Sequence, residues 1–308
     1  MAQRTVLVTG ATGKQGGALV DQLIADKSPL NILALTRNVE SASAKKLAAK
    51  SSNITLIRGD FDDCDAIFSK LPATHPKVWG VYSIQVAIGG KSTPASEERQ
   101  GKALIDAAIK HGVEMFVYSS VERGGDQVSD TTATAVPHFA SKFRIEQYLR
   151  AQAEKSGMKW TIFRPVAFYD NITDDFMGKG FGSMWRTGMD KNKPLQFIAV
   201  RDIGIMAAKA FEEPEKYAGR AIGLAGDELN FSQAKEIFEK NSGGAPLPDT
   251  LSVVGYGLRF IMADLGKMFK FFDNPGYGVK IAEVRKMHPG LRDFATWVRE
   301  ESAWKGKA

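Results

Sequence analysis

Short apolar runs and longer amphipathic stretches alternate along the first half of the chain. The first run, residues 5–9 (TVLVT), is rich in β-branched residues and too short for a helix, so it predicts a strand buried on both faces. A glycine-rich turn follows, and apolar residues then recur with helical spacing from Ala18 to Ile24. The same alternation predicts further strands over residues 31–35, 54–57, 78–84, 116–118 and 160–163, with helices over 44–49, 96–110 and 141–156.

This alternation indicates right-handed crossovers and a parallel sheet that helices cover on both faces. We therefore expect an α/β protein with a Rossmann-type doubly wound parallel sheet and a smaller C-terminal α+β domain. A chain of 308 residues is longer than the roughly 250–300 residues that one hydrophobic core usually serves, which favours two domains. We place a nucleotide-binding domain over residues 1–165 and a substrate or partner domain over 166–308, partly interleaved with the first.

In the second half of the chain the alternation breaks. Residues 178–188 are rich in glycine and aromatic residues and predict a loop or a short helix, whereas residues 200–211 predict a helix capped by Asp202. A late strand is expected over 221–225 and another helix over 232–241. Apolar residues at spacings of four and three then predict one face of a long amphipathic helix; they are Val254, Leu258, Ile261, Leu265, Met268 and Phe272. We interpret this stripe as core packing, with a lid over a ligand or a dimer face as the alternatives.

Composition narrows the class of protein. Hydrophobic residues make up 44% and charged residues 25% of the chain, as in globular proteins, and the net charge of +6 is spread without a block of like charges. Direct nucleic-acid binding is therefore not expected. No apolar run approaches the ~18 residues of a membrane span, and no signal peptide is evident, so we expect a soluble cytoplasmic protein and leave the nucleus open.

Metal and thiol chemistry are also not expected. The single cysteine, Cys64, and the histidines at 75, 111, 138 and 288 lack the spacing of metal ligands. Cys64 directly follows Asp62 and Asp63, and nearby negative charge raises the pKa of a thiol, which argues against a reactive thiolate.

The strongest chemical signal directly follows the first predicted strand. Glycines at 10, 13 and 16 give the spacing G-x-x-G-x-x-G between a strand and a helix. Gly10 allows a tight turn, Gly13 lets the backbone approach a pyrophosphate, and Gly16 lets the helix pack close to the sheet. Backbone N–H groups and the positive end of the helix dipole face such a turn, so it predicts a dinucleotide-phosphate site.

The end of the second predicted strand distinguishes the two nicotinamide dinucleotides. An acidic residue about 20 positions after the glycine motif usually binds the ribose hydroxyls of NAD. This chain has Thr36-Arg37-Asn38 there, and a guanidinium can make two hydrogen bonds to a 2′-phosphate. Arg37 therefore predicts NADP(H), with a solvent-facing arginine as the alternative.

An acidic segment closes the third predicted strand. Asp60 and Phe61 stand where a nucleotide-binding domain meets the adenine ring. The alternative, a helix cap made by Asp62 or Asp63, is compatible with contact to the adenine ring.

Together these motifs resemble the NmrA-like family, a group of atypical short-chain dehydrogenase relatives that includes fungal regulators, NADPH-sensor-like proteins and reductases. The resemblance rests on the segments 10–17, 36–38, 59–63 and 164–171 and extends over essentially the whole chain. It implies that the chain binds NADP(H). The residues that it places at the cofactor are Gly10, Thr12, Gly13, Lys14, Gln15 and Gly16 at the pyrophosphate, Arg37 and Asn38 at the 2′-phosphate, Asp60 and Phe61 at the adenine, Ser83, Ile84 and Gln85 along the ribose and nicotinamide, Lys142 at the nicotinamide ribose, and Phe168, Tyr169, Asp170 and Asn171 at the nicotinamide end.

The catalytic pattern of short-chain dehydrogenases is only half present. In those enzymes a tyrosine precedes a lysine by four residues, and the lysine charge lowers the pKa of the tyrosine. Here His138 stands at the tyrosine position and Lys142 at the lysine position, while Ser119 and Ser120 keep hydroxyls upstream. Either Lys142 or His138 passes a proton during hydride transfer, or Lys142 only binds the ribose and His138 packs at the cofactor edge.

Two functions follow. The first is an NADPH-dependent oxidoreductase that transfers a hydride to a small carbonyl, enone or imine substrate, and we give it precedence. Aromatic and methionine side chains suit a water-excluding pocket for it, unless they form a closed core; they are Phe168, Tyr169, Phe176, Phe181, Met184 and Trp185. The second is a non-catalytic NADPH/NADP sensor that regulates a protein partner, which the histidine at the tyrosine position favours. A homodimer is left open.

Overall fold

The computed structural model describes residues 3–71, 77–87, 92–261 and 263–306, and the chain divides into two compact units. Unit 1 comprises residues 1–120, 140–164 and 203–222, and unit 2 comprises 121–139, 165–202 and 223–308. Two segments thus cross the predicted border at residue 165. Residues 121–139 belong to unit 2, and residues 203–222 belong to unit 1.

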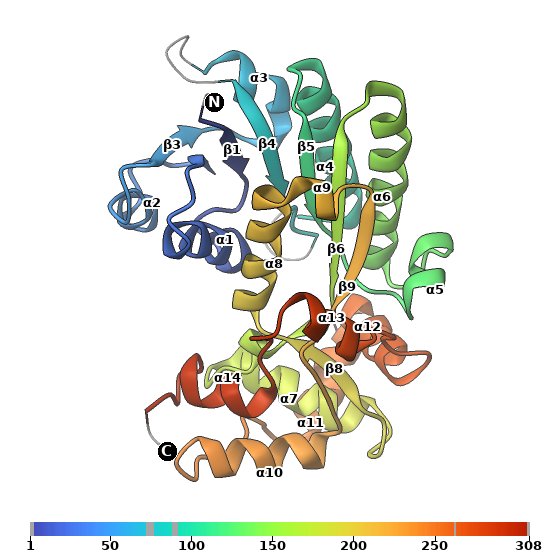
Figure 1. Cartoon of the computed structure of the whole chain (residues 1–308). Coiled ribbons are helices and arrows are strands. Elements are labelled where there is room, and N and C mark those ends of the chain that lie inside the picture. The colour runs from blue at the N-terminus through green and yellow to red at the C-terminus, as the bar shows by residue number, and fades with distance from the viewer. Residues whose placement is uncertain (1–2, 72–76, 88–91, 262, 307–308) are drawn as a thin grey trace. The chain divides into compact units, whose positions relative to one another are not determined.

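A seven-stranded sheet in the order β3-β2-β1-β4-β5-β6-β9 forms the centre of unit 1 (Figure 1). Its strands are β1 (Thr5–Val8), β2 (Asn31–Thr36), β3 (Ile54–Arg58), β4 (Val78–Ser83), β5 (Met115–Ser119), β6 (Lys159–Pro165) and β9 (Arg220–Leu224). The first six pair in parallel, with Leu7 beside Leu33 on one side and Val81 on the other. The order reverses between β1 and β4, as in doubly wound folds, so the predicted fold class is confirmed.

Helices pack on both faces of this sheet because the central strands are buried on both sides. The helices of this unit are α1 (Lys14–Ala25), α2 (Ala42–Ala48), α3 (Cys64–Ser69), α4 (Pro94–Lys110), α6 (Pro137–Ser156), α8 (Val200–Glu212) and α9 (Pro214–Tyr217), with a 3₁₀ turn η1 (Phe61–Asp63). Apolar side chains of α3, α4 and α6 form one core with the strands; Leu104 and Ile145 are fully buried in it. On the other face, Gly204 of α8 packs against Ala18 of α1, and Phe211 lies over Gly80.

Unit 2 is a smaller mixed sheet, β10-β8-β7, packed with helices around an aromatic core. Its elements are β7 (Ala167–Phe168), β8 (Leu195–Ile198), β10 (Asp227–Leu229), η2 (Tyr169–Asn171), α5 (Asp126–Thr131), α7 (Phe176–Gly188), α10 (Phe231–Asn241), α11 (Ser252–Ile261), α12 (Ala263–Asp273), α13 (Ile281–Met287) and α14 (Phe294–Glu300). Tyr169 stacks in this core on Phe197, Phe294 and Trp297, with ring centroids 5.3 to 5.6 Å apart. Among the described residues of the chain, no helix is long and apolar enough to cross a bilayer.

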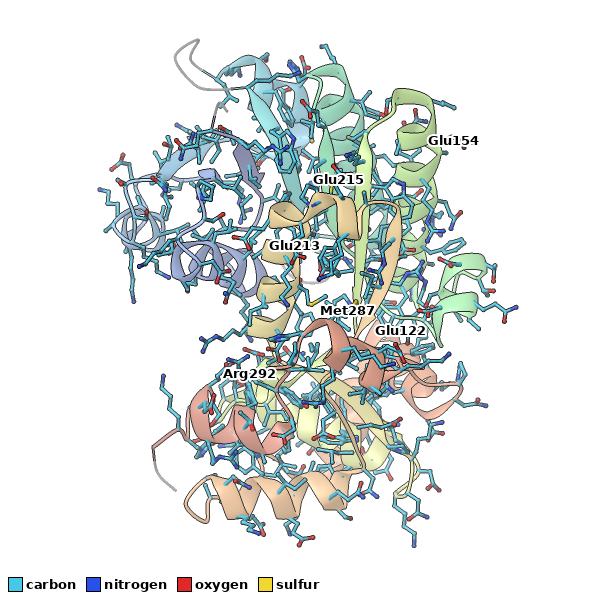
Figure 2. The ribbon with its side chains drawn as sticks, in the orientation of Figure 1. Glu122, Glu154, Glu213, Glu215, Met287 and Arg292 are labelled. Carbon is cyan, nitrogen blue, oxygen red and sulfur yellow. The ribbon has the colours of Figure 1, made fainter. Side chains whose placement is uncertain are left out.

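Buried polar groups join distant segments of unit 2. Glu122, labelled in Figure 2, accepts backbone N–H bonds from Gly124 at 2.9 Å and Gly278 at 3.1 Å. Asp202 accepts from Arg292 Nη1 at 2.6 Å and lies 2.9 Å from His288 Nε2 (Arg292 is labelled in Figure 2). These carboxylates are buried, so their charge-assisted hydrogen bonds fix the loops that they hold.

Three sequence predictions in this part of the chain were wrong in detail. Residues 178–188 form a helix rather than a loop, and this helix, α7, is 13 residues long rather than short; Asp175 caps it by accepting the Gly178 N–H. The long helix over 254–272 is two helices, α11 and α12. A β-carbon at Gly266 would lie 2.6 Å from Arg259 O, so this glycine allows α12 to approach α11 closely.

The third correction concerns Asp202, which does not cap its helix. It lies in the first turn of α8, and its carboxylate binds the C-terminal segment through Arg292 and His288. The first N–H of α8, that of Val200, is instead accepted by Asp170 Oδ2 at 2.9 Å. Spacing along the sequence could not distinguish these two aspartates, because the cap comes from 30 residues upstream.

Candidate functional site

The glycine-rich turn joins β1 to α1 with an open helix start. Gly10 has a φ of +59°, a conformation that favours glycine, and its carbonyl accepts the Gly13 N–H at 2.9 Å. Gly13 then stands at the N-cap of α1 without a side-chain cap, so no side chain blocks the positive end of the helix. Gly16 lies so close to Gly10 that a β-carbon would be 2.3 Å from Gly10 O. The turn is therefore packed closely against the first residues of α1, and the uncapped N-terminus of α1 fits a pyrophosphate.

Neighbouring strand ends hold this turn in place. Thr9 Oγ1 accepts the Ile84 N–H at 2.8 Å, which fixes the end of β4 beside the turn. The side chain of Gln85, almost fully buried, donates to Ser83 Oγ at 2.8 Å. From β5, Ser119 Oγ donates to Gln15 Oε1 at 2.6 Å. The predicted segment 83–85 is thus brought together with the glycine-rich turn.

Arg37 and Asn38 directly follow β2, at the carboxyl ends of the strands, where the glycine-rich turn also lies. Arg37 is exposed, and no hydrogen bond or ion pair to another described residue holds its guanidinium. Asn38 Oδ1 accepts the Glu40 N–H at 2.9 Å, which orders the turn and leaves the amide N–H₂ for a ligand. A free guanidinium beside an open helix N-terminus suits a second phosphate.

Asp60 and Phe61 follow β3, where the Gly59 N–H bonds Thr36 O at 3.1 Å and aligns the two strand ends. Asp60 caps η1 by accepting the Asp62 N–H at 2.7 Å, and Asp63 caps α3 by accepting the Ala66 N–H at 3.1 Å. The capping prediction is therefore confirmed for Asp63. Phe61 packs half-buried against the core of unit 1, so one part of its ring remains accessible.

Lys142 lies on α6 with its ammonium held inside unit 1. Its Nζ is 2.8 Å from Oε1 of Glu97, a fully buried carboxylate of α4, and 5.8 Å from the ring centroid of Tyr118 near the carboxyl end of β5. The Lys142 side chain is 14% exposed. It therefore presents an accessible but fixed positive charge. Sequence reasoning missed Glu97, because it stands among polar residues at a helix start and no motif marks it.

The two serines at the end of β5 are both engaged with other side chains. Ser119 bonds Gln15, as described above, and Ser120 donates a short hydrogen bond to Glu146 Oε1. Glu146 also forms a buried ion pair with Arg164 Nη2 at 2.6 Å. The hydrogen bonds of these two hydroxyls hold the end of β5 in place.

The remaining predicted residues belong to unit 2. His138 is buried and meets Phe139 edge to face, with centroids 4.7 Å apart. Tyr169 is fully buried, and burial raises the pKa of its phenol well above the usual value. Asp170 caps α8, Phe168 is partly exposed and Asn171 is exposed.

The aromatic set proposed as a pocket is largely a closed core. Tyr169, Phe181, Met184 and Trp185 are buried in the core of unit 2, and Phe176 alone of the set is strongly exposed, at 65%. The alternative of a closed core is thus the correct one for these four. Large rings at one helical face pack together in unit 2, because each buries more apolar area there than on a pocket wall.

No group of His, Cys, Asp and Glu side chains suited to a metal occurs among the described residues; His75 lies outside them. Cys64 is buried under the acidic segment. Burial, together with the charges of Asp60, Asp63 and Asp62, raises the pKa of its thiol to about 12. The predicted direction is confirmed, although burial rather than charge is the larger cause.

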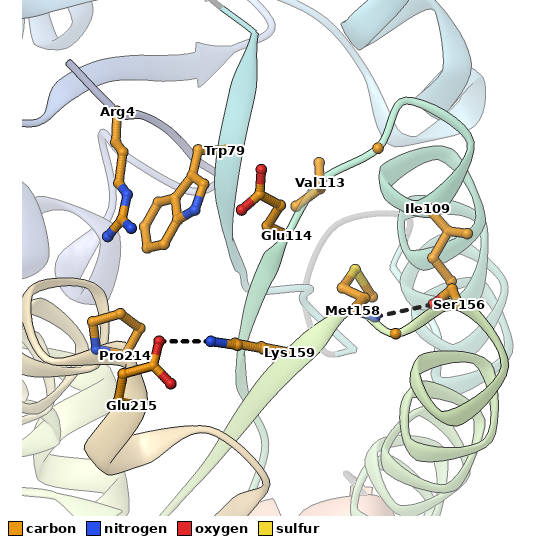
Figure 3. A pocket seen from close by; sticks show the side chains of 12 residues that line it. Arg4, Trp79, Ile109, Val113, Glu114, Ser156, Met158, Lys159, Pro214 and Glu215 are labelled. Atoms are coloured by element: carbon orange, nitrogen blue, oxygen red, sulfur yellow. Dashed lines mark hydrogen bonds and ion pairs between the residues drawn. The ribbon is translucent and has the colours of Figure 1, made fainter. Parts of the chain in front are cut away.

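A pocket of about 300 Å³ lies at the amino ends of the strands, opposite the ends that carry the glycine-rich turn (Figure 3). Its walls come from β4, from residues at or just before the starts of β1, β5 and β6, from the ends of α4 and α6, and from α9. Arg4 covers the Trp79 ring at 4.3 Å, and Lys159 pairs with Glu215 at 2.6 Å across it. None of the predicted cofactor residues lines this pocket, so it is separate from the glycine-rich turn.

The model of the NmrA-like family matches residues 2–296. The chain belongs to the NmrA-like family. A member from Dictyostelium discoideum is 24% identical over 280 residues, covering 89% of this chain and 88% of its own. The oxidoreductase FrzB of a Cladobotryum species, which has an NmrA-like family domain, is 24% identical over 262 residues, covering 77% of this chain and 73% of its own.

Solved structures agree with this fold. NmrA, a negative transcriptional regulator, matches with a TM-score of 0.70 in complex with NAD and 0.68 in complex with NADP. The identities are 23% and 22%, and each match covers 98% of this chain and 96% of NmrA. The proteins to which this chain is similar therefore include a named oxidoreductase and a named transcriptional regulator.

Proposed function

We propose that this chain is an NADPH-dependent oxidoreductase that transfers a hydride to a small carbonyl, enone or imine substrate. The observation that carries the catalytic part is the Lys142 ammonium, which is accessible yet fixed by a buried carboxylate beside the end of β5. When bound, NADPH supplies the hydride. Lys142 would donate a hydrogen bond, and then a proton, to the substrate oxygen or nitrogen on which negative charge develops.

The cofactor part of the proposal is supported by the turn after β1. Its uncapped helix start would bind the pyrophosphate through backbone N–H groups, and the exposed Arg37 would bind the 2′-phosphate. Asp60 and Phe61 would border the adenine, and Ser83 to Gln85 the nicotinamide side. FrzB, named an oxidoreductase, and NmrA, solved with NADP, are consistent with this assignment.

A second function, a sensor of NADPH and NADP that regulates a protein partner, is favoured by one observation. The group at the tyrosine position, His138, is buried against Phe139, and both upstream serine hydroxyls are used within the protein. A chain without a free acid at that position could bind the cofactor and report its state. NmrA, a transcriptional regulator, provides a precedent on the same fold.

Calorimetric titration with NADPH, NADP⁺ and NADH tests the cofactor part. We expect the phosphorylated cofactors to bind at least tenfold more tightly, about 1.4 kcal/mol. Arg37→Asp should reverse this preference, because a carboxylate repels the 2′-phosphate and can bond ribose hydroxyls. Arg220→Asp, with the same charge change at the start of β9, is the matched control. Unchanged NADPH affinity in Arg37→Asp would remove Arg37 from the site.

Turnover distinguishes the two functions. NADPH oxidation is followed with quinones, enones, aldehydes and cyclic imines as candidate substrates. Lys142→Met should abolish turnover of any substrate found while NADPH still binds. Tight NADPH binding without turnover of any of these classes would favour the sensor.

A further inference from the structure

We propose that Glu97 is a positioning residue for the reaction, because it fixes the Lys142 ammonium at the end of β5. The inference rests on the proposed oxidoreductase function and names the residue through which Lys142 acts. Glu97 is fully buried in the first turn of α4, and its carboxylate points to two consecutive residues of α6. Oε2 accepts Ser141 Oγ at 2.5 Å, and Oε1 lies 2.8 Å from Lys142 Nζ.

Helix capping does not explain this carboxylate. The start of α4 already has a complete capping box, in which Thr93 Oγ1 accepts the Ser96 N–H at 3.1 Å and Ser96 Oγ accepts the Thr93 N–H at 2.8 Å. An acidic residue that merely complements the helix dipole can remain in water. Glu97 is instead withdrawn from solvent completely, whereas the neighbouring Glu98 is 21% exposed and pairs with Lys102 and Arg144.

Stability alone does not explain the pair either. Desolvation of a carboxylate and an ammonium offsets much of their attraction, and apolar residues of similar volume would serve a core equally well. What the pair provides is a fixed place for a flexible side chain. A lysine has four rotatable side-chain bonds, and a carboxylate held by Ser141 restricts its ammonium to one position.

The position leaves the ammonium able to act. The ammonium forms an ion pair with Glu97 Oε1 at 2.8 Å, and the centroid of the Tyr118 ring lies 5.8 Å away. The side chain is still 14% exposed, so a further N–H can reach a ligand at the carboxyl edge of the sheet. Glu97 therefore acts through Lys142 and does not touch the substrate.

The test compares Glu97→Gln, Glu97→Asp and the control Glu98→Gln in the full chain. We expect Glu97→Gln to lower kcat at least tenfold while the KM for the substrate and the Kd for NADPH change less than threefold. Glu97→Asp, which keeps the charge, should recover part of kcat, and Glu98→Gln should behave as wild type. A merely structural role would weaken cofactor binding in parallel with kcat and would not be rescued by the charge. Unchanged kcat in Glu97→Gln overturns the inference and leaves the oxidoreductase proposal intact.

A second measurement does not depend on turnover. The rate at which Lys142 is methylated by formaldehyde and borohydride, followed by peptide mass spectrometry, should rise at least tenfold in Glu97→Gln and stay unchanged in Glu98→Gln. If the wild type turns over no substrate, the oxidoreductase proposal fails and this rate alone decides whether Glu97 positions Lys142; an equal rate in the two variants overturns it. If Glu97→Gln does not fold, Glu97→Asp, which draws the carboxylate back by one methylene, is measured in its place with the same directions expected.

Discussion

Replacing Gly16 by alanine should damage both the cofactor site and the fold. A β-carbon there would lie 2.3 Å from Gly10 O, 2.6 Å from Gly10 C and 2.8 Å from Ala11 N. All three are backbone atoms, so no side chain can rotate away. Relative to an ordinary contact of 3.4 Å, the overlap with Gly10 O is about 1 Å, and the glycine-rich turn itself must move.

The size of the effect follows from two opposing terms. Overpacking of this kind costs about 1–3 kcal/mol, whereas alanine in place of glycine within a helix gains about 1 kcal/mol. The free energy of unfolding should therefore fall by up to about 2 kcal/mol. NADPH binding should weaken at least tenfold, about 1.4 kcal/mol, because the turn that must move is the one whose backbone N–H groups would hold the pyrophosphate.

Gly17→Ala is the matched control, one residue further along α1. Its β-carbon would lie 3.5 Å from Ala11 O, an ordinary contact, so only the favourable helix term remains and stability should rise. Urea unfolding and calorimetric NADPH titration measure both variants. The reasoning would be refuted if Gly16→Ala bound NADPH within threefold of wild type and unfolded no more readily than Gly17→Ala.

Two further predictions concern groups away from the glycine-rich turn. Arg164→Met should lower the free energy of unfolding, measured by urea unfolding, by about 3–5 kcal/mol, because it removes the arginine that pairs with the buried Glu146 carboxylate. A smaller loss in the double variant Arg164→Met/Glu146→Leu would show that the cost comes from the carboxylate left without its arginine. Equal losses in the two variants would contradict this explanation. Cys64 should react with a thiol reagent at pH 8 far more slowly in the folded chain than in urea, because a thiol with a pKa of about 12 is protonated at that pH. Comparable rates in the two states would contradict the burial of Cys64.

Local sequence patterns predicted most of the elements of unit 1. The strands that begin at residues 5, 31, 54, 78 and 115 are short runs of mainly apolar residues, and the glycine spacing identified the turn, because both signals lie within a few neighbouring residues. The elements of unit 2 were harder to predict from the sequence. Its helix α7 is capped by Asp175 and contains several glycines, which act as packing contacts there although glycine usually interrupts helices.

The candidate site, too, was predicted in part from local sequence patterns. Gly10, Gly13, Gly16 and Arg37 follow from the motif and its strand context. The partners of Lys142 could not be predicted, because Glu97 lies 45 positions earlier and becomes its neighbour only when α4 and α6 pack on one face of the sheet. The burial of Tyr169 was left as one of two alternatives, since an aromatic residue in a motif has the same sequence signature whether it faces a ligand or a core.

The nucleotide-binding half of this protein cannot be completed early in its synthesis. Its last segment, residues 203–222, contributes most of α8 and the edge strand β9, and Phe211 of α8 covers the Gly80 face of the sheet. A nascent chain that ends near residue 165 would expose that apolar face to water. Folding on the ribosome should therefore wait until about residue 222 has left the exit tunnel, and a fragment cut at the border that the sequence suggests should aggregate rather than bind a nucleotide.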